Sequence, residues 1–266
     1  MAFNELGFLF VFFPAALLLH ALTPNKVRNI LLLVVSLVFF AWGSAEYLLL
    51  LVLSIVFNYF SGLQLAAQKD SPKKAKLTLI SAVAVNLLLL GFFKYWGFLL
   101  ENVNALLGTS IPVRQLPMPL GVSFFTFSIL SFLFDIYRDQ VSAPGSILDF
   151  ALYVSFFPKL VSGPIVSYAD FTAQLKDRAL SSAKLGDGCR LFLIGLAKKV
   201  LLSDIIGKTF SALTALPSGE ISVVSAWLGA IAYTLMLYFD FSGYSDMAIG
   251  LGQMFGFRFQ KNFDYP

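Results

Sequence analysis

Long apolar stretches separated by short polar segments run along most of the chain. A membrane-crossing helix needs about 20 mostly apolar residues, and several stretches approach that length. The clearest are residues 6–22, 27–42, 47–65, 77–100, 120–137 and 222–239. The pattern therefore predicts an all-α polytopic membrane protein.

Two features of the pattern predict how these helices connect. The second and third stretches are separated only by residues 43–46, so we expect them to form an antiparallel hairpin. Residues 147–168 are apolar but are broken by Pro158 and by the pair Gly163 and Pro164. Such breaks favour a re-entrant or split helix, because irregular backbone at membrane depth must be surrounded by protein or by a water-filled cavity.

The most polar region follows. Residues 172–190 have the character of an amphipathic surface segment. Residues 191–206 are apolar but contain Lys198 and Lys199, so this stretch either lies at the interface or spans with its lysines reaching the headgroups. We expect this lysine pair to face lipid.

Composition excludes other classes of protein. Of the 266 residues, 58% are hydrophobic and 13% are charged. A soluble globule of this size could not bury so much apolar surface, and disordered chains are poor in apolar residues. The net charge of +4 does not indicate a nucleic-acid partner, because the basic residues lie in short loops between apolar stretches.

The basic loops also predict orientation. Residues 24–28, residues 69–76 and Arg138 alternate with the Lys/Arg-free turn at 43–46 and the weakly basic segment 101–117. Basic loops face the cytoplasm. We therefore expect a multi-pass membrane protein with its N-terminus outside, which is the periplasm if the cell is a Gram-negative bacterium and the membrane its inner membrane.

The residue inventory limits the chemistry. One cysteine, Cys189, permits no internal disulfide and no cysteine-based metal cluster, and we expect no metal site or bound cofactor. There is no phosphate-binding GxxxxGK[ST] motif. The one histidine, His20, ends the first apolar stretch, where an interfacial position is expected.

The strongest candidate for chemistry is the block YFDFSGYSDMAIG, residues 238–250. Carboxylates at membrane depth are costly and usually mark a cavity or a pathway. On a helix, Asp240 and Tyr244 would share one face, and Ser242 and Asp246 another. Gly243 could break that helix. The alternative is a structural hydrogen-bond network, with Gly252 and Gly256 as a close-packing pair.

Three other polar residues have candidate roles. Lys159, between two helix breaks, could pair with Asp240 or Asp246 or contact an anionic group, and the alternative is a lysine reaching the headgroups. Lys94 has the setting of an interfacial anchor among aromatic residues. Asn58 is expected to join two helices.

Several segments together resemble a known family. They include FLFVFFP (8–14), PLGVSFFTF (119–127), FPKLVSGPI (157–165) and the block 238–250, and they continue to residues 256–263 at consistent spacing. In these segments the chain is similar to membrane-bound O-acyltransferase (MBOAT) proteins of the alginate O-acetylation type. The resemblance extends over essentially the whole chain, and the block 238–250 is its most specific part.

The resemblance implies a helical bundle with split or re-entrant helices around a tunnel. It implies transfer of an acetyl group from acetyl-CoA or another cytoplasmic acyl thioester, with periplasmic acetylation proteins, an exopolysaccharide and membrane lipids as partners. The substrate-tunnel candidates are Asp240, Ser242, Tyr244, Asp246 and Lys159.

One family feature has no counterpart in residues 1–266. The family's catalytic histidine lies beyond the block that matches residues 238–250, and His20 does not match it. We therefore expect these residues to be the N-terminal part of a single MBOAT membrane domain, without a catalytic residue and inactive alone.

Other functions remain open at this stage. Within the family they are D-alanyl transfer to teichoic acids and O-acetylation of peptidoglycan. Outside it they are a transporter or flippase, suggested by broken helices and intramembrane charges, and a non-catalytic scaffold for acetylation partners.

Overall fold

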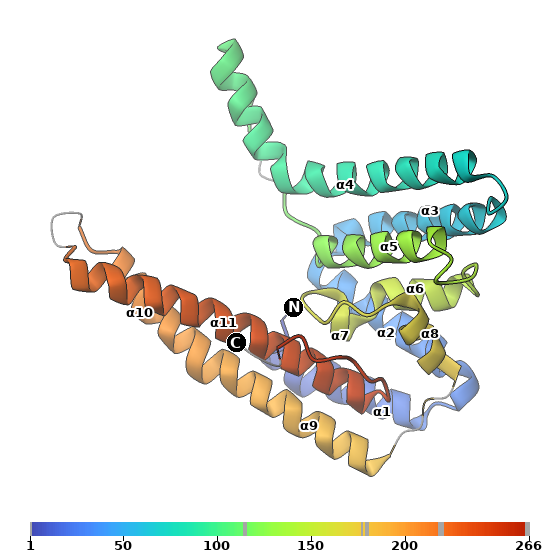
Figure 1. Cartoon of the computed structure of the whole chain (residues 1–266). Helices are drawn as coiled ribbons and strands as arrows, with labels where there is room; N and C mark the ends of the chain where they lie inside the picture. Colours follow the sequence, from blue (N-terminus) through green and yellow to red (C-terminus); the bar gives the residue numbers. More distant parts are fainter. Residues whose placement is uncertain (1, 114–115, 177, 179–180, 218–220, 264–266) are drawn as a thin grey trace. The chain divides into compact units, whose positions relative to one another are not determined.

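The computed structural model describes residues 2–113, 116–176, 178, 181–217 and 221–263, in which every regular element is helical (Figure 1). This confirms the predicted all-α class. The elements are η1 (Phe8–Phe12), α1 (Phe13–Leu22), η2 (Asn25–Val27), α2 (Arg28–Ser44), η3 (Ala45–Tyr47), α3 (Leu48–Ala67), α4 (Pro72–Leu107), α5 (Val122–Tyr137), α6 (Ile147–Ser155), α7 (Phe157–Leu160), α8 (Tyr168–Lys176), α9 (Ser182–Ala197), η4 (Lys198–Ser203), α10 (Asp204–Thr214) and α11 (Val223–Met254).

Among the described residues, three helical stretches are long and apolar enough to cross a membrane: Asn25–Ala67, Pro72–Leu107 and Val223–Met254. Two shorter apolar helices, Phe8–Leu22 and Val122–Tyr137, accompany them. Together they support the membrane location predicted from the apolar pattern.

The helices form two compact units that are discontinuous in sequence. The first contains Met1–Thr23, Ser162–Pro164 and Asp177–Pro266, and the second contains Pro24–Val161 and Ile165–Lys176. Each unit has its own packing and is described by itself.

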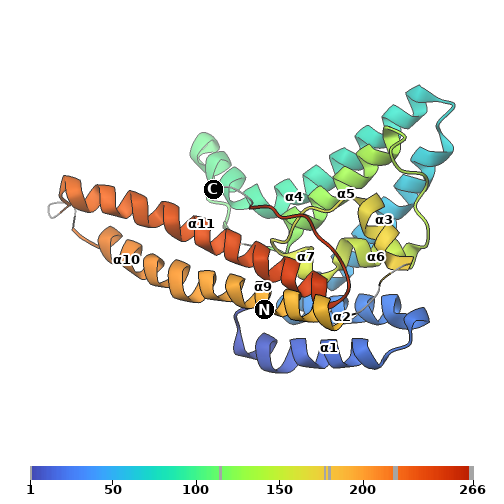
Figure 2. The ribbon, with the colours of Figure 1, turned by 60° about the horizontal axis from the view of Figure 1, so that its bottom comes forward.

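In the second unit, α4, α3 and α5 lie side by side (Figure 2). The predicted connection between α2 and α3 is present as the short 3-10 turn η3. The two helices contact each other little, however, because α6 packs against both and makes its larger contact with α2. Buried aromatic side chains fill this unit, with Phe132, Phe150 and Tyr168 in mutual contact.

The predicted split helix is present, with a different break point. The helix ends at Ser155 and restarts at Phe157, because Phe156 leaves the helical region with ψ of 110°. Pro158 stands in the first turn of α7, where proline is tolerated because it removes no intrahelical hydrogen bond. No described residue between Gly163 and Ser167 is helical.

In the first unit, α9, η4 and α10 form one continuous helical rod from Ser182 to Thr214 that lies along α11 (Figures 1 and 2). A π-helical turn, Lys198–Ser203, replaces α-helix in the middle of the rod. The amphipathic surface segment predicted over 172–190 is divided between two helices: α8 ends at Lys176, and residues from Ser182 onward belong to α9. Up to Arg190, α9 packs against α11 at Gly188 and leaves most of its other residues exposed.

Glycines let the rod and α11 approach closely. A Cβ atom on Gly188 would lie 2.7 Å from the Gly250 carbonyl oxygen, and one on Gly243 would lie 2.8 Å from the Gly195 carbonyl oxygen. The prediction that Gly243 breaks its helix is wrong, because α11 is continuous from Val223 to Met254 and uses this glycine as a contact point.

The predicted pairing of Gly252 with Gly256 is also wrong. Gly252 lies against the ring of Phe259. Gly256 follows the end of α11 with a φ of +89°, a conformation that glycine adopts readily. The close packing of the rod against α11 depends instead on two glycines in each helix, seven residues apart: Gly188 and Gly195 in the rod, and Gly243 and Gly250 in α11.

Candidate functional site

Two lysines at the start of η4 form ion pairs with the two carboxylates of the block 238–250. The Lys198 ammonium lies 2.6 Å from Asp246, and the Lys199 ammonium lies 2.6 Å from Asp240 and 2.9 Å from Asp204. The expectation that these lysines face lipid is wrong. In an apolar environment the carboxylates need nearby cations, and the neighbouring helix supplies them.

The backbone geometry explains why these pairs form. Gly243 lies between the two aspartates, and a Cβ atom there would be 3.1 Å from Lys198 Cβ and 3.2 Å from the Lys199 backbone nitrogen. The absent side chain thus brings the start of the π-helical turn against α11. Asp204 follows Lys199 by five residues, the spacing that a π-helical turn brings together.

Three hydroxyl groups in the same block lack hydrogen-bond partners among the described residues. They are the buried hydroxyls of Ser242, Ser245 and Tyr244. By contrast, the helical serines Ser61 and Ser155 donate to a carbonyl one turn earlier, at 2.9 Å and 2.7 Å. An unsatisfied buried hydroxyl costs about 1–3 kcal/mol. These groups are therefore available for hydrogen bonds to a substrate or to water.

The predicted helical faces have unequal surroundings. Asp240 and Tyr244 share a face by spacing, but the Asp240 side chain is about half-exposed, whereas the Tyr244 ring stacks on Phe3 with centroids 4.6 Å apart. Ser242 is fully buried, and Asp246, one turn later, is mostly buried and paired. The block thus presents paired charges together with unpaired hydroxyls.

A polar groove of about 700 Å³ lies beside the Lys199 ion pairs. Asp204, Asp240, Lys208 and Ser203 line it together with Lys199. The Ser203 hydroxyl donates a hydrogen bond to the Met236 carbonyl at 3.0 Å. Charged side chains from η4, α10 and α11 therefore border one groove.

Lys159, in the second unit, has a different setting from the one expected. It is only 4% exposed, so it does not reach the headgroups. Its ammonium lies 3.8 Å from the centroid of the Tyr153 ring and 5.6 Å from that of Phe171, as in a cation–π interaction. Its pairing with Asp240 or Asp246, which belong to the other unit, stays a prediction.

The surroundings of Lys159 affect its protonation. Tyr153 lies in α6 and Lys159 in α7, and both helices are too short to cross a membrane. Burial lowers the pKa of the Lys159 ammonium to about 7. The Tyr153 hydroxyl is held by the carbonyls of Val166 at 3.0 Å and Ser128 at 3.2 Å, which fixes the ring under the lysine.

The short helix α7 is held in place from two sides. The Phe157 backbone N–H donates to the Ser36 hydroxyl at 3.1 Å. On the other side, Gly121 has a φ of +64° and leaves no room for a Cβ atom against the Leu160 carbonyl. These contacts fix where Lys159 stands.

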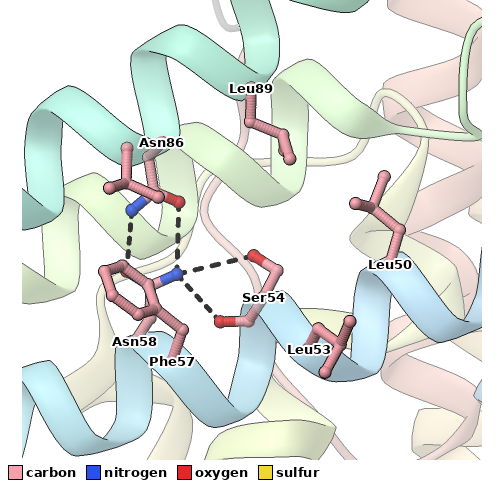
Figure 3. A pocket seen from close by; sticks show the side chains of 8 residues that line it. Leu50, Leu53, Ser54, Phe57, Asn58, Asn86 and Leu89 are labelled. Atoms are coloured by element: carbon pink, nitrogen blue, oxygen red, sulfur yellow. Dashed lines mark hydrogen bonds between the residues drawn. The ribbon is translucent and has the colours of Figure 1, made fainter.

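Asn58 and Asn86 form a reciprocal amide pair between α3 and α4 (Figure 3). Asn86 donates to Asn58 at 2.7 Å, and Asn58 donates to Asn86 at 3.2 Å. Both are buried and border a small cavity of about 180 Å³ whose other walls are mostly apolar. The predicted structural role of Asn58 is confirmed.

Two further predictions concern single residues. His20 is 2% exposed and meets the Phe255 ring edge-on with centroids 5.1 Å apart, and its interfacial position stays a prediction. Lys94 is exposed with its ammonium 5.7 Å from the Tyr95 ring centroid, a position compatible with the predicted anchor. No group of three or more His, Cys, Asp or Glu side chains among the described residues could hold a metal ion.

Sequence reasoning missed the roles of Ser245, Tyr153 and Asp204. Asp204 carried a usable signal, because an acid five residues after Lys199 in an apolar stretch indicates local charge pairing. Tyr153 carried none, because its contact with Lys159 depends on a turn between two helices.

Comparison with known proteins places this arrangement in a family. Residues 36–265 match the model of the membrane-bound O-acyltransferase family, MBOAT. The chain belongs to the MBOAT family. The block 238–250, with its ion pairs and free hydroxyls, and the split helix at Lys159 both lie within the matched region.

Several curated MBOAT relatives match the entire chain. It is 41% identical over 271 positions to the probable alginate O-acetylase AlgI of Pseudomonas aeruginosa, covering 100% of this chain and 52% of that protein. It is 36% identical to a peptidoglycan O-acetyltransferase of Helicobacter pylori, covering 100% and 56%. A teichoic acid D-alanyltransferase of Bacillus subtilis is 28% identical over 70% of this chain. The chain spans about half the length of the curated relatives it matches.

Proposed function

We propose that this chain is part of a membrane O-acyltransferase that passes an acetyl group from a cytoplasmic thioester across the inner membrane to an exopolysaccharide such as alginate. The carrying observation is the similarity of the whole of this chain to about half the length of alginate O-acetylases, at 36–41% identity. The paired charges and partnerless hydroxyls on one apolar helix support a polar passage beside α11.

The reaction defines what the passage must supply. An acceptor hydroxyl attacks the thioester carbonyl, the new C–O bond forms, and the C–S bond breaks to release a thiol. A base takes the hydroxyl proton, and hydrogen-bond donors stabilise the oxyanion. The buried Ser242, Tyr244 and Ser245 hydroxyls are available as such donors, whereas Asp240 and Asp246 keep the adjoining lysines in place.

In this proposal the catalytic base is supplied from outside residues 1–266. His20 is a poor candidate, because it is buried against Phe255. We therefore assign this chain to the wall of the passage. Lys159 is proposed to contact an anionic group of the donor or acceptor.

The test measures labelled acetyl transfer in sealed inner-membrane vesicles. The complete reading frame that contains this chain is expressed, labelled acetyl-CoA is supplied on the cytoplasmic face, and alginate or peptidoglycan is supplied on the other. Label in alginate supports the proposal. Label only in peptidoglycan would assign the acceptor of the Helicobacter relative, and label in neither polymer would contradict acetyl transfer.

Variants then test whether the hydroxyls of Ser242 and Ser245 contribute to the wall of the proposed passage. Ser242→Ala and Ser245→Ala remove hydroxyls that have no partner in the described part of the chain, so they should leave protein levels unchanged. We expect at least a tenfold lower transfer rate in the double variant. The matched control is Ser61→Ala, which removes a hydroxyl already bonded within its own helix.

A further inference from the structure

An apolar cavity of about 510 Å³ lies in the first unit where three helix ends meet. It is bordered by α1, by the start of α9 and by the end of α11. Its volume falls within the range of about 300–1,000 Å³ typical of small-molecule sites. Its apolar walls are Pro14, Leu17, Leu18, Ala21, Leu185 and Met254.

The polar groups of this cavity form a small set. Lys184 lines it from the first turn of α9, where the Ser181 side chain accepts a hydrogen bond from the Lys184 backbone N–H at 3.2 Å. Gln253 lines it from α11, and its side-chain oxygen is buried with no hydrogen-bond donor among the described residues. His20, Ser181 and Ser182 complete the polar part of the lining. Lys184 and Gln253 thus place a cation and an unsatisfied acceptor next to apolar walls.

This combination selects a ligand that is apolar at one end and carries both an anion and a hydrogen-bond donor at the other. We propose that the cavity binds a phospholipid with an anionic, hydroxyl-bearing headgroup, such as phosphatidylglycerol. An acyl chain lies against Leu17, Leu18 and Met254. The phosphate contacts Lys184, and a headgroup hydroxyl donates to the Gln253 oxygen.

The predicted membrane orientation agrees with this occupant. In it the end of α1, which borders the cavity, lies on the cytoplasmic side. Anionic lipids in the cytoplasmic leaflet interact favourably with lysines at that surface. A wholly polar ligand would leave the apolar walls without a partner.

The experiment measures lipid retained by the purified protein. The protein is extracted from nanodiscs containing equal amounts of phosphatidylglycerol and phosphatidylcholine, and bound lipids are counted by native mass spectrometry. We expect one phosphatidylglycerol per chain, retained at least fivefold over phosphatidylcholine. Equal retention of both lipids, or retention of neither, would overturn the proposal.

Cavity variants separate this site from general lipid adhesion. Leu18→Trp fills the cavity from a side chain that is 61% exposed, and Leu19→Trp is its control, 49% exposed on the same helix and not part of the lining. Leu18→Trp should abolish retention, and Leu19→Trp should not. Unchanged retention in Leu18→Trp would exclude this cavity.

Headgroup variants test the polar contacts. Lys184→Ala should reduce the preference for phosphatidylglycerol to less than twofold, whereas Lys73→Ala, which removes an exposed lysine from the first turn of α4 at a predicted cytoplasmic position, should not. Gln253→Leu should lower retention of phosphatidylglycerol without affecting that of phosphatidylcholine. A preference unchanged in both Lys184→Ala and Gln253→Leu would contradict the assigned headgroup contacts.

Discussion

The Lys198 ammonium donates to the Asp246 carboxylate across 2.6 Å, joining the π-helical turn η4 to α11. The two side chains are 29% and 15% exposed. With the Lys199 pairs one residue later, this contact neutralises both acids of the block 238–250. Removing one partner leaves the other charge in a largely apolar setting, which costs more than removing both.

The first prediction concerns this ion pair. We expect Asp246→Asn and Lys198→Met each to lower the free energy of unfolding, by roughly 1–3 kcal/mol after allowance for the exposed fraction. The double variant should be less destabilised than the sum of the two. Thermal unfolding in detergent measures all three, and additive effects would contradict the coupling. The exposed pair Lys69 and Asp139 is the control, expected to couple by less than about 1 kcal/mol.

The second prediction compares two glycines of α11. Gly243→Ala places a Cβ atom 2.8 Å from the Gly195 carbonyl oxygen, whereas Gly229→Ala meets nothing within 4 Å. Both changes gain about 1 kcal/mol of helix propensity, so their difference isolates the backbone contact. Gly243→Ala should lower the unfolding midpoint and Gly229→Ala should keep or raise it. Equal midpoints would show that the helices do not pack through this glycine.

The third prediction concerns the amide pair of α3 and α4. Asn58→Leu leaves the Asn86 side chain buried without its partner, which costs about 1–3 kcal/mol. Asn58→Leu with Asn86→Leu removes both polar groups and should recover most of the loss. Thermal midpoints of the two variants decide this. A double variant as unstable as the single one would show that the amides contribute more than their mutual hydrogen bonds.

The fourth prediction is a pH dependence at Lys159. Its folded pKa is about 7, below the value near 10.4 of a free lysine, so the unfolded chain binds more protons between these values. The destabilisation is complete below about pH 7 and is lost as the pH rises towards about 10.4. Lys159→Met should therefore stabilise the protein most at pH 6 and very little at pH 10.5.

The control for this measurement is Lys94→Met, at an exposed lysine. Its effect on the unfolding midpoint should not change between the two pH values. A pH-independent effect of Lys159→Met would show that the ammonium remains fully hydrated in the folded protein.

The fold could be predicted from the sequence wherever one physical requirement dominated. Apolar stretches located the long helices, and Gly163 with Pro164 located the break after α7. Charge partners could not be predicted, because they depend on the register between two helices. Gly195 and Gly243 set that register by backbone contact. As a result, Lys198 and Lys199 lie beside the carboxylates of α11 and do not face lipid as expected.

The residues of the candidate site could also be predicted only in part. The block 238–250 was recognisable because carboxylates rarely occur next to an 18-residue apolar run. The environment of Lys159 was not, because the Tyr153 ring reaches it only after the chain has turned at Phe156. Helical spacing alone also could not show that Ser242 and Ser245 lack the carbonyl partner that Ser61 has.

The ion pairs between the rod and α11 have a consequence for how the protein enters the membrane. Each lysine or aspartate at the centre of an isolated helix opposes insertion by about 2.5–3.5 kcal/mol. The rod carries two such lysines and α11 two such aspartates, so neither is expected to leave the translocon alone. The two helices are separated by only eight residues, 215–222. We therefore expect the rod and α11 to enter the lipid together, as a hairpin whose lysines and aspartates are already paired.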